Sequence, residues 1–238
     1  MMTPNFEQRQ IIAMGGGSFM GVPDKCRLER YVLSQVKAAR PRVLFLPTAS
    51  GESPEYTVKF YEVFSNFAVD ATHFSFFKPS TKDLRDLFLS KDLIYVGGGN
   101  TKSMLALWRE WGVDKIIKEA WESGVVLCGV SAGMICWFEE GITDSIPGDL
   151  TPLPCLGMLP GSACPHYDSE LERRPTFHRM LSDKQIRPGI ACDDGAAAHF
   201  KGTELFQIVT SRPHANAYAM SLEGGKVLEK RLASKYLG

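Results

Sequence analysis

The chain has 238 residues, of which 44% are hydrophobic and 23% are charged, values typical of a soluble globular protein that can bury a substantial core. Basic and acidic residues number 27 each, so the net charge is zero. This balance argues against a nucleic acid or an anionic membrane as the main partner, because both favour a basic face. No apolar run approaches the ~18 residues of a membrane span, and the N-terminal stretch MMTPNFEQRQ lacks the apolar segment of a signal peptide.

The six cysteines are scattered along the chain without a C-x-x-C pair. This spacing favours neither a zinc site nor a disulfide framework. We therefore expect a cytosolic protein that uses no metal and no other cofactor.

Short apolar runs alternate with stretches of helical spacing through the first half of the chain. Strands are predicted at 11–14, 42–46, 70–77, 92–96 and 125–128, and helices at 25–39, 54–67, 81–89 (with Ser80 as its cap), 102–111 and from Ala132 onward. This alternation predicts an α/β fold in three layers, with a mostly parallel sheet between helices on both faces. In such a sheet the functional site lies at the carboxyl ends of the strands.

The pattern loosens in the second half of the chain. It predicts a Pro- and Gly-rich loop at 147–161, a helix at 170–182, strands at 190–192, 197–200, 204–209 and 217–220, and a hairpin turn at 223–226. These strands are expected to form a closing antiparallel set. We see no internal repeat and no second domain, so residues 1–238 are predicted to form a single α/β domain.

Glycine-rich turns follow two of the predicted strands. The first, 15–17, resembles the start of a dinucleotide-binding loop, but the pattern G-x-G-x-x-G would need glycine where the chain has Met20. A flexible loop at the end of a strand is the simpler interpretation. The second, 97–99, precedes a helix, and its three glycines let the backbone approach a ligand closely with N–H groups free to point at it.

The sequence Gly129-Val130-Ser131-Ala132-Gly133 matches the pattern G-x-S-x-G, directly after a buried strand. Small residues beside a serine allow a sharp strand-to-helix turn that exposes the serine hydroxyl, as in the nucleophile elbow of hydrolases. The backbone N–H of Ala132, at the start of the helix, would point to a developing oxyanion. The alternative interpretation is an ordinary tight turn.

A serine nucleophile needs a base to take its proton, and a histidine usually serves. His166 follows a proline in a loop just beyond the Ser131 turn, which makes it the best candidate. The other histidines have simpler interpretations. His73 and His199 lie in predicted strands, His178 faces outward from a predicted helix, and His214 lies in a polar loop.

Four motifs in order along the chain resemble the peptidase E family of serine peptidases, which also includes cyanophycinases. They are V-G-G-G-N-T (96–101), G-V-S-A-G (129–133), T-D-S (143–145) and P-H-Y (165–167), and the resemblance covers most of the chain from about residue 42. It implies a class I glutamine amidotransferase-like fold. It also implies Ser131 as the nucleophile, His166 as the base, and the N–H groups of Gly99 and Ala132 as oxyanion donors.

The resemblance leaves the triad acid and the substrate contacts open. Asp144, in the T-D-S motif, matches one aspartate of the family and is the favoured acid. Asp194 lies where some members have a glutamate before glycine, and it is the alternative. Asn100 and the adjacent Arg173 and Arg174 are candidate substrate-binding residues, because a guanidinium suits a carboxylate.

The sequence thus predicts a cytosolic serine peptidase of the peptidase E type, acting as a monomer or homodimer. It would hydrolyse small peptides, including dipeptides with N-terminal aspartate, through an acyl-enzyme. One rival is an amidotransferase-like enzyme, which would carry a cysteine at the turn, whereas Cys128 lies three residues earlier inside the strand. A second rival is a binding protein that keeps the fold without turnover.

Overall fold

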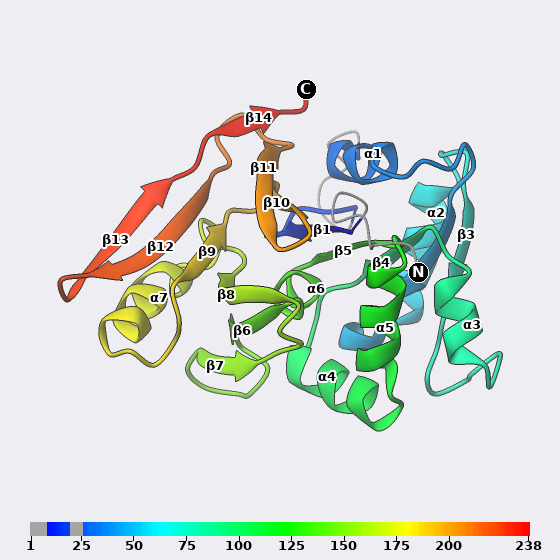
Figure 1. The fold of residues 1–238 in the computed structure, drawn as a ribbon, viewed down its shortest axis with the longest axis horizontal. Helices are drawn as coiled ribbons and strands as arrows, with labels where there is room; N and C mark the ends of the chain where they lie inside the picture. Colours follow the sequence, from blue (N-terminus) through cyan, green and yellow to red (C-terminus); the bar gives the residue numbers. More distant parts are fainter. Residues whose placement is uncertain (1–8, 20–25) are drawn as a thin grey trace, which may run out of the picture.

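The computed structural model describes residues 9–19 and 26–238, and this part of the chain forms two β-sheets (Figure 1). Within these residues the larger sheet has eight strands in the order β14-β11-β10-β1-β5-β4-β2-β3. Their bounds are β1 (Gln10–Met14), β2 (Arg42–Leu46), β3 (Asp70–His73), β4 (Leu93–Val96), β5 (Val126–Val130), β10 (Ala196–Lys201), β11 (Glu204–Thr210) and β14 (Ser234–Tyr236).

The centre of the larger sheet is parallel. Strand β1 pairs with β5, β5 with β4, β4 with β2, and β2 with β3, all in parallel. Strand β10 then adds to the other side of β1 in antiparallel orientation, and β11 adds to β10 in the same way. The carboxyl ends of β1, β2, β4 and β5 therefore meet at one edge, where their loops lie together.

Helices cover both faces of this sheet. They are α1 (Arg27–Ser34), α2 (Pro54–Phe64), α3 (Leu84–Leu89), α4 (Thr101–Glu110), α5 (Val113–Glu122) and α6 (Ala132–Ile135), with a short 3₁₀ turn at Thr48–Ser50. Successive strand residues point to opposite faces. Phe45 and Tyr95 accordingly pack with side chains of α1 and α2, whereas Leu44 and Ile94 pack with those of α3, α4 and α5. This three-layer arrangement confirms the predicted fold class.

The smaller sheet has six strands within the described residues, in the order β13-β12-β9-β8-β6-β7. Their bounds are β6 (Phe138–Thr143), β7 (Thr151–Pro154), β8 (Leu159–Cys164), β9 (Gly189–Cys192), β12 (Ala217–Glu223) and β13 (Lys226–Arg231). Helix α7 (Arg173–Ser182) packs on this sheet through Phe177, Met180 and Leu181. Figure 1 shows the sheet and α7 beside the larger sheet, with the β12–β13 hairpin at the outer side.

The sequence pattern does not predict this second sheet. The expected loop at 147–161 contains β7 and the start of β8. Both strands contain proline or glycine, which are typical of loops, so their extended conformation was not predicted. The expected antiparallel set is also divided, because β10 and β11 extend the larger sheet while β9 and β12 belong to the smaller one. Strand periodicity reports the faces of a strand but not its partner, so this division could not be read from the sequence.

Several element ends differ from the prediction. The expected start of the first helix at Lys25, and Met20 in the loop before it, lie outside the described residues. Strand β3 ends at His73, and α3 begins only at Leu84, where the side chain of Asp83 rather than that of Ser80 caps the helix. Helix α5 has no counterpart among the predicted elements. In residues 9–19 and 26–238, no helix is both long and apolar enough to cross a membrane.

His199 is a fully buried polar residue in β10, 0% exposed. Its Nδ1 lies 2.6 Å from the Tyr31 hydroxyl and its Nε2 lies 2.9 Å from Oε1 of Gln10. Since the amide oxygen can only accept, Nε2 carries the proton and Nδ1 accepts from Tyr31, which satisfies the neutral ring. Burial, with a contribution from Lys201, lowers the pKa of His199 to about 4.

We predict that the free energy of unfolding falls as the pH drops from 7 to 4. The unfolded chain binds the His199 proton near its ordinary pKa of about 6.5, whereas the folded protein does so only near pH 4, so folding loses about 3 kcal/mol over this range. Denaturant unfolding of the wild type and of His199→Gln at both pH values measures this contribution, since the other titrating groups are shared. An equal loss of stability in the two proteins would contradict it.

Candidate active site

Ser131 lies at the turn between β5 and α6, at the carboxyl edge of the larger sheet. Its backbone has φ 57° and ψ −109°, a conformation that non-glycine residues rarely adopt and that is concentrated at functional sites. The two glycines of G-x-S-x-G allow the strand and helix to touch: a Cβ on Gly129 would lie 2.5 Å from the carbonyl oxygen of Gly133, and one on Gly133 would overlap that of Val96. The motif therefore forms the predicted sharp turn.

His166 is held against a carboxylate. Its Nδ1 lies 2.7 Å from Oδ1 of Asp194, and the two side chains are 20% and 27% exposed. Because a carboxylate accepts, Nδ1 carries the ring proton and Nε2 is left to accept another. His166 also has a positive φ, 53°, so both candidate catalytic residues have an unusual backbone conformation.

Polar neighbours hold Asp194 in place. Its N–H donates to Oδ1 of Asp168 over 2.8 Å, and its carbonyl oxygen accepts from Nε of Arg212, also over 2.8 Å. Burial alone would raise the pKa of the Asp194 carboxyl, but the hydrogen bond and charge of His166, with Ser169 and Arg212, bring it below its ordinary value. The group is therefore an ionised partner for His166 at neutral pH.

The glycine loop after β1 joins the two halves of the site. The N–H of Ser131 donates to the carbonyl of Met14, and that of His166 donates to the carbonyl of the next residue, Gly15, both over 3.1 Å. A Cβ on Gly16 would overlap the Asp194 carboxylate and lie 2.7 Å from Nδ1 of His166. The loop 15–17, expected only as a flexible turn, thus lies directly against the histidine–aspartate pair.

The glycine loop after β4 lies on the other side of Ser131. A Cβ on Gly98 would be 3.3 Å from Cβ of Ser131. The N–H groups of Gly97 and Asn100 donate to Leu46 and Ala49 carbonyls, and that of Gly98 donates to the Tyr56 hydroxyl. Among the described residues, the N–H groups of Gly99 and Ala132 have no acceptor. Both predicted oxyanion donors are therefore free to bind one.

The structure places the two candidate acids differently. Asp144 follows β6, its side chain is 66% exposed, and its carboxylate lies 3.8 Å from the guanidinium of Arg173 rather than against His166. The T-D-S motif instead packs on the start of α4, where the side chain of Asn100 donates to the carbonyl of Ser145. Asp194, the alternative acid, is the carboxylate beside the imidazole.

The expected substrate contacts are also occupied by internal partners. Asn100 caps α4, since its side-chain oxygen accepts from the N–H of Ser103 over 2.8 Å. Arg173 is 2% exposed and donates to the carbonyl of Ile142 and to Glu170. Arg174 pairs with Glu229 and lies over two tyrosine rings. Their adjacency in sequence gave no sign that these arginines connect α7 to the smaller sheet.

Three of the other histidines have structural partners, whereas the side chain of His214 is exposed. The side chains of His73, His178 and His199 bond to Tyr61, Glu229 and Tyr31. Cys128 is fully buried within β5, and burial raises the pKa of its thiol well above its ordinary value, so it is unsuited to act as a nucleophile. In the part of the chain that the structure describes, no three His, Cys, Asp or Glu residues are grouped to hold a metal ion.

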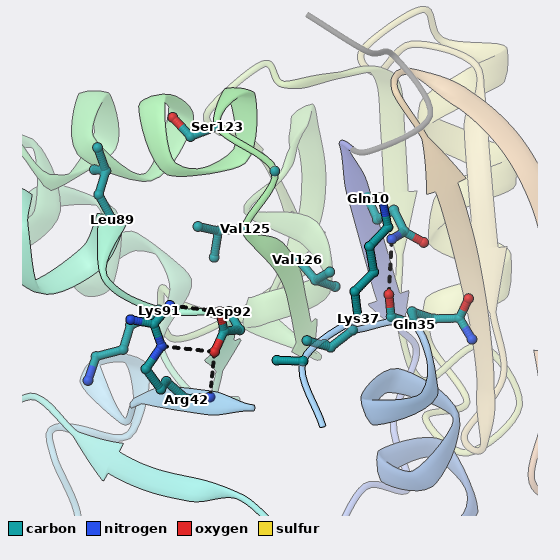
Figure 2. A pocket seen from close by; sticks show the side chains of 13 residues that line it. Gln10, Gln35, Lys37, Arg42, Leu89, Lys91, Asp92, Ser123, Val125 and Val126 are labelled. Carbon is teal, nitrogen blue, oxygen red and sulfur yellow. Dashed lines mark hydrogen bonds and ion pairs between the residues drawn. The ribbon is translucent and has the colours of Figure 1, made fainter. Parts of the chain in front are cut away.

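A cavity of about 360 Å³ lies at the opposite edge of the larger sheet (Figure 2). Gln10, Arg42 and Val126, the first residues of β1, β2 and β5, line it. Its Arg42 is paired with Asp92, whose two carboxylate oxygens accept from the guanidinium over 2.9 and 3.0 Å. Since Ser131 follows the carboxyl end of β5, this cavity is separate from the candidate active site.

The model of peptidase family S51 matches residues 11–208 of the chain. The chain belongs to peptidase family S51. The match includes the glycine loop after β1, which the resemblance seen in the sequence did not cover. The protein is therefore a serine-type peptidase, and the predicted resemblance to the peptidase E family is confirmed.

Similar proteins support this assignment. The chain is 52% identical over 230 residues to the uncharacterized peptidase YgaJ of Bacillus subtilis (strain 168), covering 97% of this chain and 100% of that protein. It is 27% identical over 199 residues to the uncharacterized peptidase Lmo0363 of Listeria monocytogenes serovar 1/2a (strain ATCC BAA-679 / EGD-e), covering 80% of this chain and 86% of that protein.

Two solved structures share the fold. A peptidase from an acI-B1 Actinobacterium superposes with a TM-score of 0.69 at 18% identity, over 94% of each chain. A candidate peptidase E protein from Listeria monocytogenes EGD-e superposes with a TM-score of 0.62 at 19% identity, over 94% of this chain and 99% of that one.

The two aspartates give a direct test of the geometry. We predict that Asp194→Asn lowers the rate of peptide hydrolysis by several orders of magnitude, since an amide at this position favours the wrong imidazole tautomer and costs roughly 10⁴-fold in well-studied triads. Asp144→Asn is the matched control and should stay within a few-fold of the wild type. Circular dichroism and thermal unfolding check that both variants fold, and the opposite ranking of the two rates would contradict the geometry.

Proposed function

We propose that this peptidase hydrolyses small peptides through an acyl-enzyme formed on Ser131, with His166 as the base and Asp194 as the acid that orients it. The observation that carries the proposal is the hydrogen bond of 2.7 Å between Nδ1 of His166 and Oδ1 of Asp194. It leaves Nε2 of the ring as the atom that accepts the serine proton. The backbone bonds of Ser131 and His166 to consecutive carbonyls support the pairing of these residues.

In the first half of the reaction, Oγ of Ser131 attacks the scissile carbonyl carbon while His166 takes the hydroxyl proton. The negative charge that develops on the carbonyl oxygen is stabilised by the N–H groups of Gly99 and Ala132, which have no other acceptor among the described residues. The ionised Asp194 stabilises the imidazolium. His166 then gives its proton to the leaving amine, and the acyl group remains on Ser131.

In the second half, a water molecule repeats the attack on the acyl-enzyme. His166 takes a proton from the water and returns it to Oγ of Ser131, which releases the acid product. Every charge in this cycle has a partner on the chain: Asp194 for the imidazolium and the two N–H groups for the oxyanion. The reaction requires no metal and no other cofactor.

The proposed substrates are small peptides, including dipeptides with N-terminal aspartate. Likeness to the peptidase E family supports this substrate class. We further propose a cytoplasmic location, in keeping with six free cysteines, and a monomer or homodimer without a nucleic acid or membrane partner.

Labelling with a fluorophosphonate tests the nucleophile. We predict that the probe modifies Ser131 in the wild type and that Ser131→Ala folds normally but hydrolyses no peptide above roughly 10⁻⁴ of the wild-type rate, because loss of the nucleophile removes the covalent route. Peptide mapping by mass spectrometry identifies the labelled residue. A wild type that resists the probe and cleaves no peptide would favour a binding protein that keeps the fold.

A panel of dipeptides tests the substrate class. We predict the largest kcat/KM for dipeptides with N-terminal aspartate, compared with N-terminal asparagine, alanine and leucine at the same second residue. Asparagine is the matched control because it keeps the size of aspartate and removes only the charge. Equal kcat/KM values for all four dipeptides would contradict the preference for N-terminal aspartate but not the peptidase activity.

A further inference from the structure

The hydroxyl of Tyr56 is a buried polar group that contacts the glycine loop beside Ser131. Tyr56 lies in α2 and is 6% exposed. Its oxygen accepts a hydrogen bond of 3.2 Å from the backbone N–H of Gly98. Helix α2 does not need this hydrogen bond in order to form. The Tyr56 hydroxyl therefore acts on the glycine loop rather than on its own helix.

Packing fixes the position of this ring. Tyr56 lies against Phe45 and Phe19, with ring centroids 5.1 and 5.4 Å away. A Cβ on Gly97 would be 2.9 Å from Cε1 of Tyr56, so the loop passes directly over the ring. The hydroxyl is therefore presented to the loop from a rigid aromatic cluster of the core.

The loop itself is fixed at every N–H except one. Leu46 and Ala49 accept from Gly97 and Asn100 through their carbonyls, and Tyr56 accepts from Gly98. Only the N–H of Gly99 has no acceptor among the residues that the structure describes. Glycine has little intrinsic preference for one backbone conformation, so three consecutive glycines would otherwise leave the direction of this N–H poorly defined.

The Tyr56 hydroxyl also belongs to a buried polar network. The side chain of Ser18 lies near the hydroxyls of Tyr56 and Tyr95. Glu29 in α1 accepts from Tyr95 over 3.4 Å and from the N–H of Phe19 over 2.9 Å. Burial raises the pKa of Tyr56 to about 12, so its hydroxyl stays protonated and neutral at physiological pH. The network joins the residues after the first glycine loop to the second glycine loop.

We infer that Tyr56 is a positioning residue for catalysis: its hydroxyl holds the N–H of Gly98 so that the next N–H, that of Gly99, points at the oxyanion. This inference rests on the proposed function, because it assigns Gly99 as an oxyanion donor beside Ser131. Tyr56 itself touches no substrate. Its loss should affect the transition state more than the bound substrate, since the oxyanion forms only during the reaction.

The test is Tyr56→Phe, with Tyr61→Phe as the matched control. Tyr61 lies on the same helix, and its hydroxyl bonds to His73 at the surface, away from Ser131. We expect Tyr56→Phe to lower kcat by about 10- to 100-fold with KM within about 3-fold, less than the 10²- to 10³-fold cost of removing an oxyanion donor outright. The rate of fluorophosphonate labelling should fall in parallel, and Tyr61→Phe should keep both rates.

The outcomes separate this inference from the proposed function. If the wild type and Tyr56→Phe are labelled at Ser131 at equal rates and turn over equally, the inference is wrong and the proposed function stands. If the wild type is not labelled at all, both are wrong. Should Tyr56→Phe not fold, amide hydrogen exchange in the wild type tests the same contact. The N–H of Gly98, which donates to Tyr56, should exchange much more slowly than that of Gly99, and equally fast exchange of the two would overturn the inference.

Discussion

The active site depends on one packing constraint, the close contact between the backbone of the loop after β1 and the His166–Asp194 pair. Gly16 is the residue in contact, and any side chain there would occupy the space of the Asp194 carboxylate. The same loop accepts the N–H groups of Ser131 and His166 through the carbonyls of Met14 and Gly15. Strand β1 lies between β5, which directly precedes Ser131, and β10, which follows Asp194. The central position of β1 in the sheet therefore brings Ser131 and His166, the proposed nucleophile and base, to the same loop.

Local signals in the sequence predicted the parallel half of the fold and the sharp turn at Ser131. Buried strands followed by glycines identify the carboxyl edge of a sheet, and G-x-S-x-G specifies a turn through the close approach of its own two glycines. No local signal in the sequence could decide between Asp144 and Asp194 as the acid. The choice depends on how β9 joins the smaller sheet and β10 the larger one, and strand periodicity does not encode these long-range pairings.

The arginine pair also shows that a single sequence does not reveal long-range partners. Arg173 and Arg174 were read as free because a single sequence shows charges without their partners. Their partners include Glu229, more than fifty residues away in β13, and the carbonyl of Ile142 in β6. Glu229 could not be matched to α7 without knowledge of the β12–β13 hairpin. The second sheet, which the sequence pattern did not predict, thus also supplies internal partners to the arginines that were candidate substrate contacts.

The order of the site residues along the chain has a consequence for protein synthesis. Strands β1 to β5 and the Ser131 turn are complete once residue 135 has been made, whereas Asp194 and the β10 strand that docks beside β1 come about sixty residues later. A partly made chain of this length therefore contains Ser131 but neither His166 nor Asp194. On the proposed mechanism, a growing polypeptide can hydrolyse a peptide only after residue 194 has been made and β10 has paired with β1.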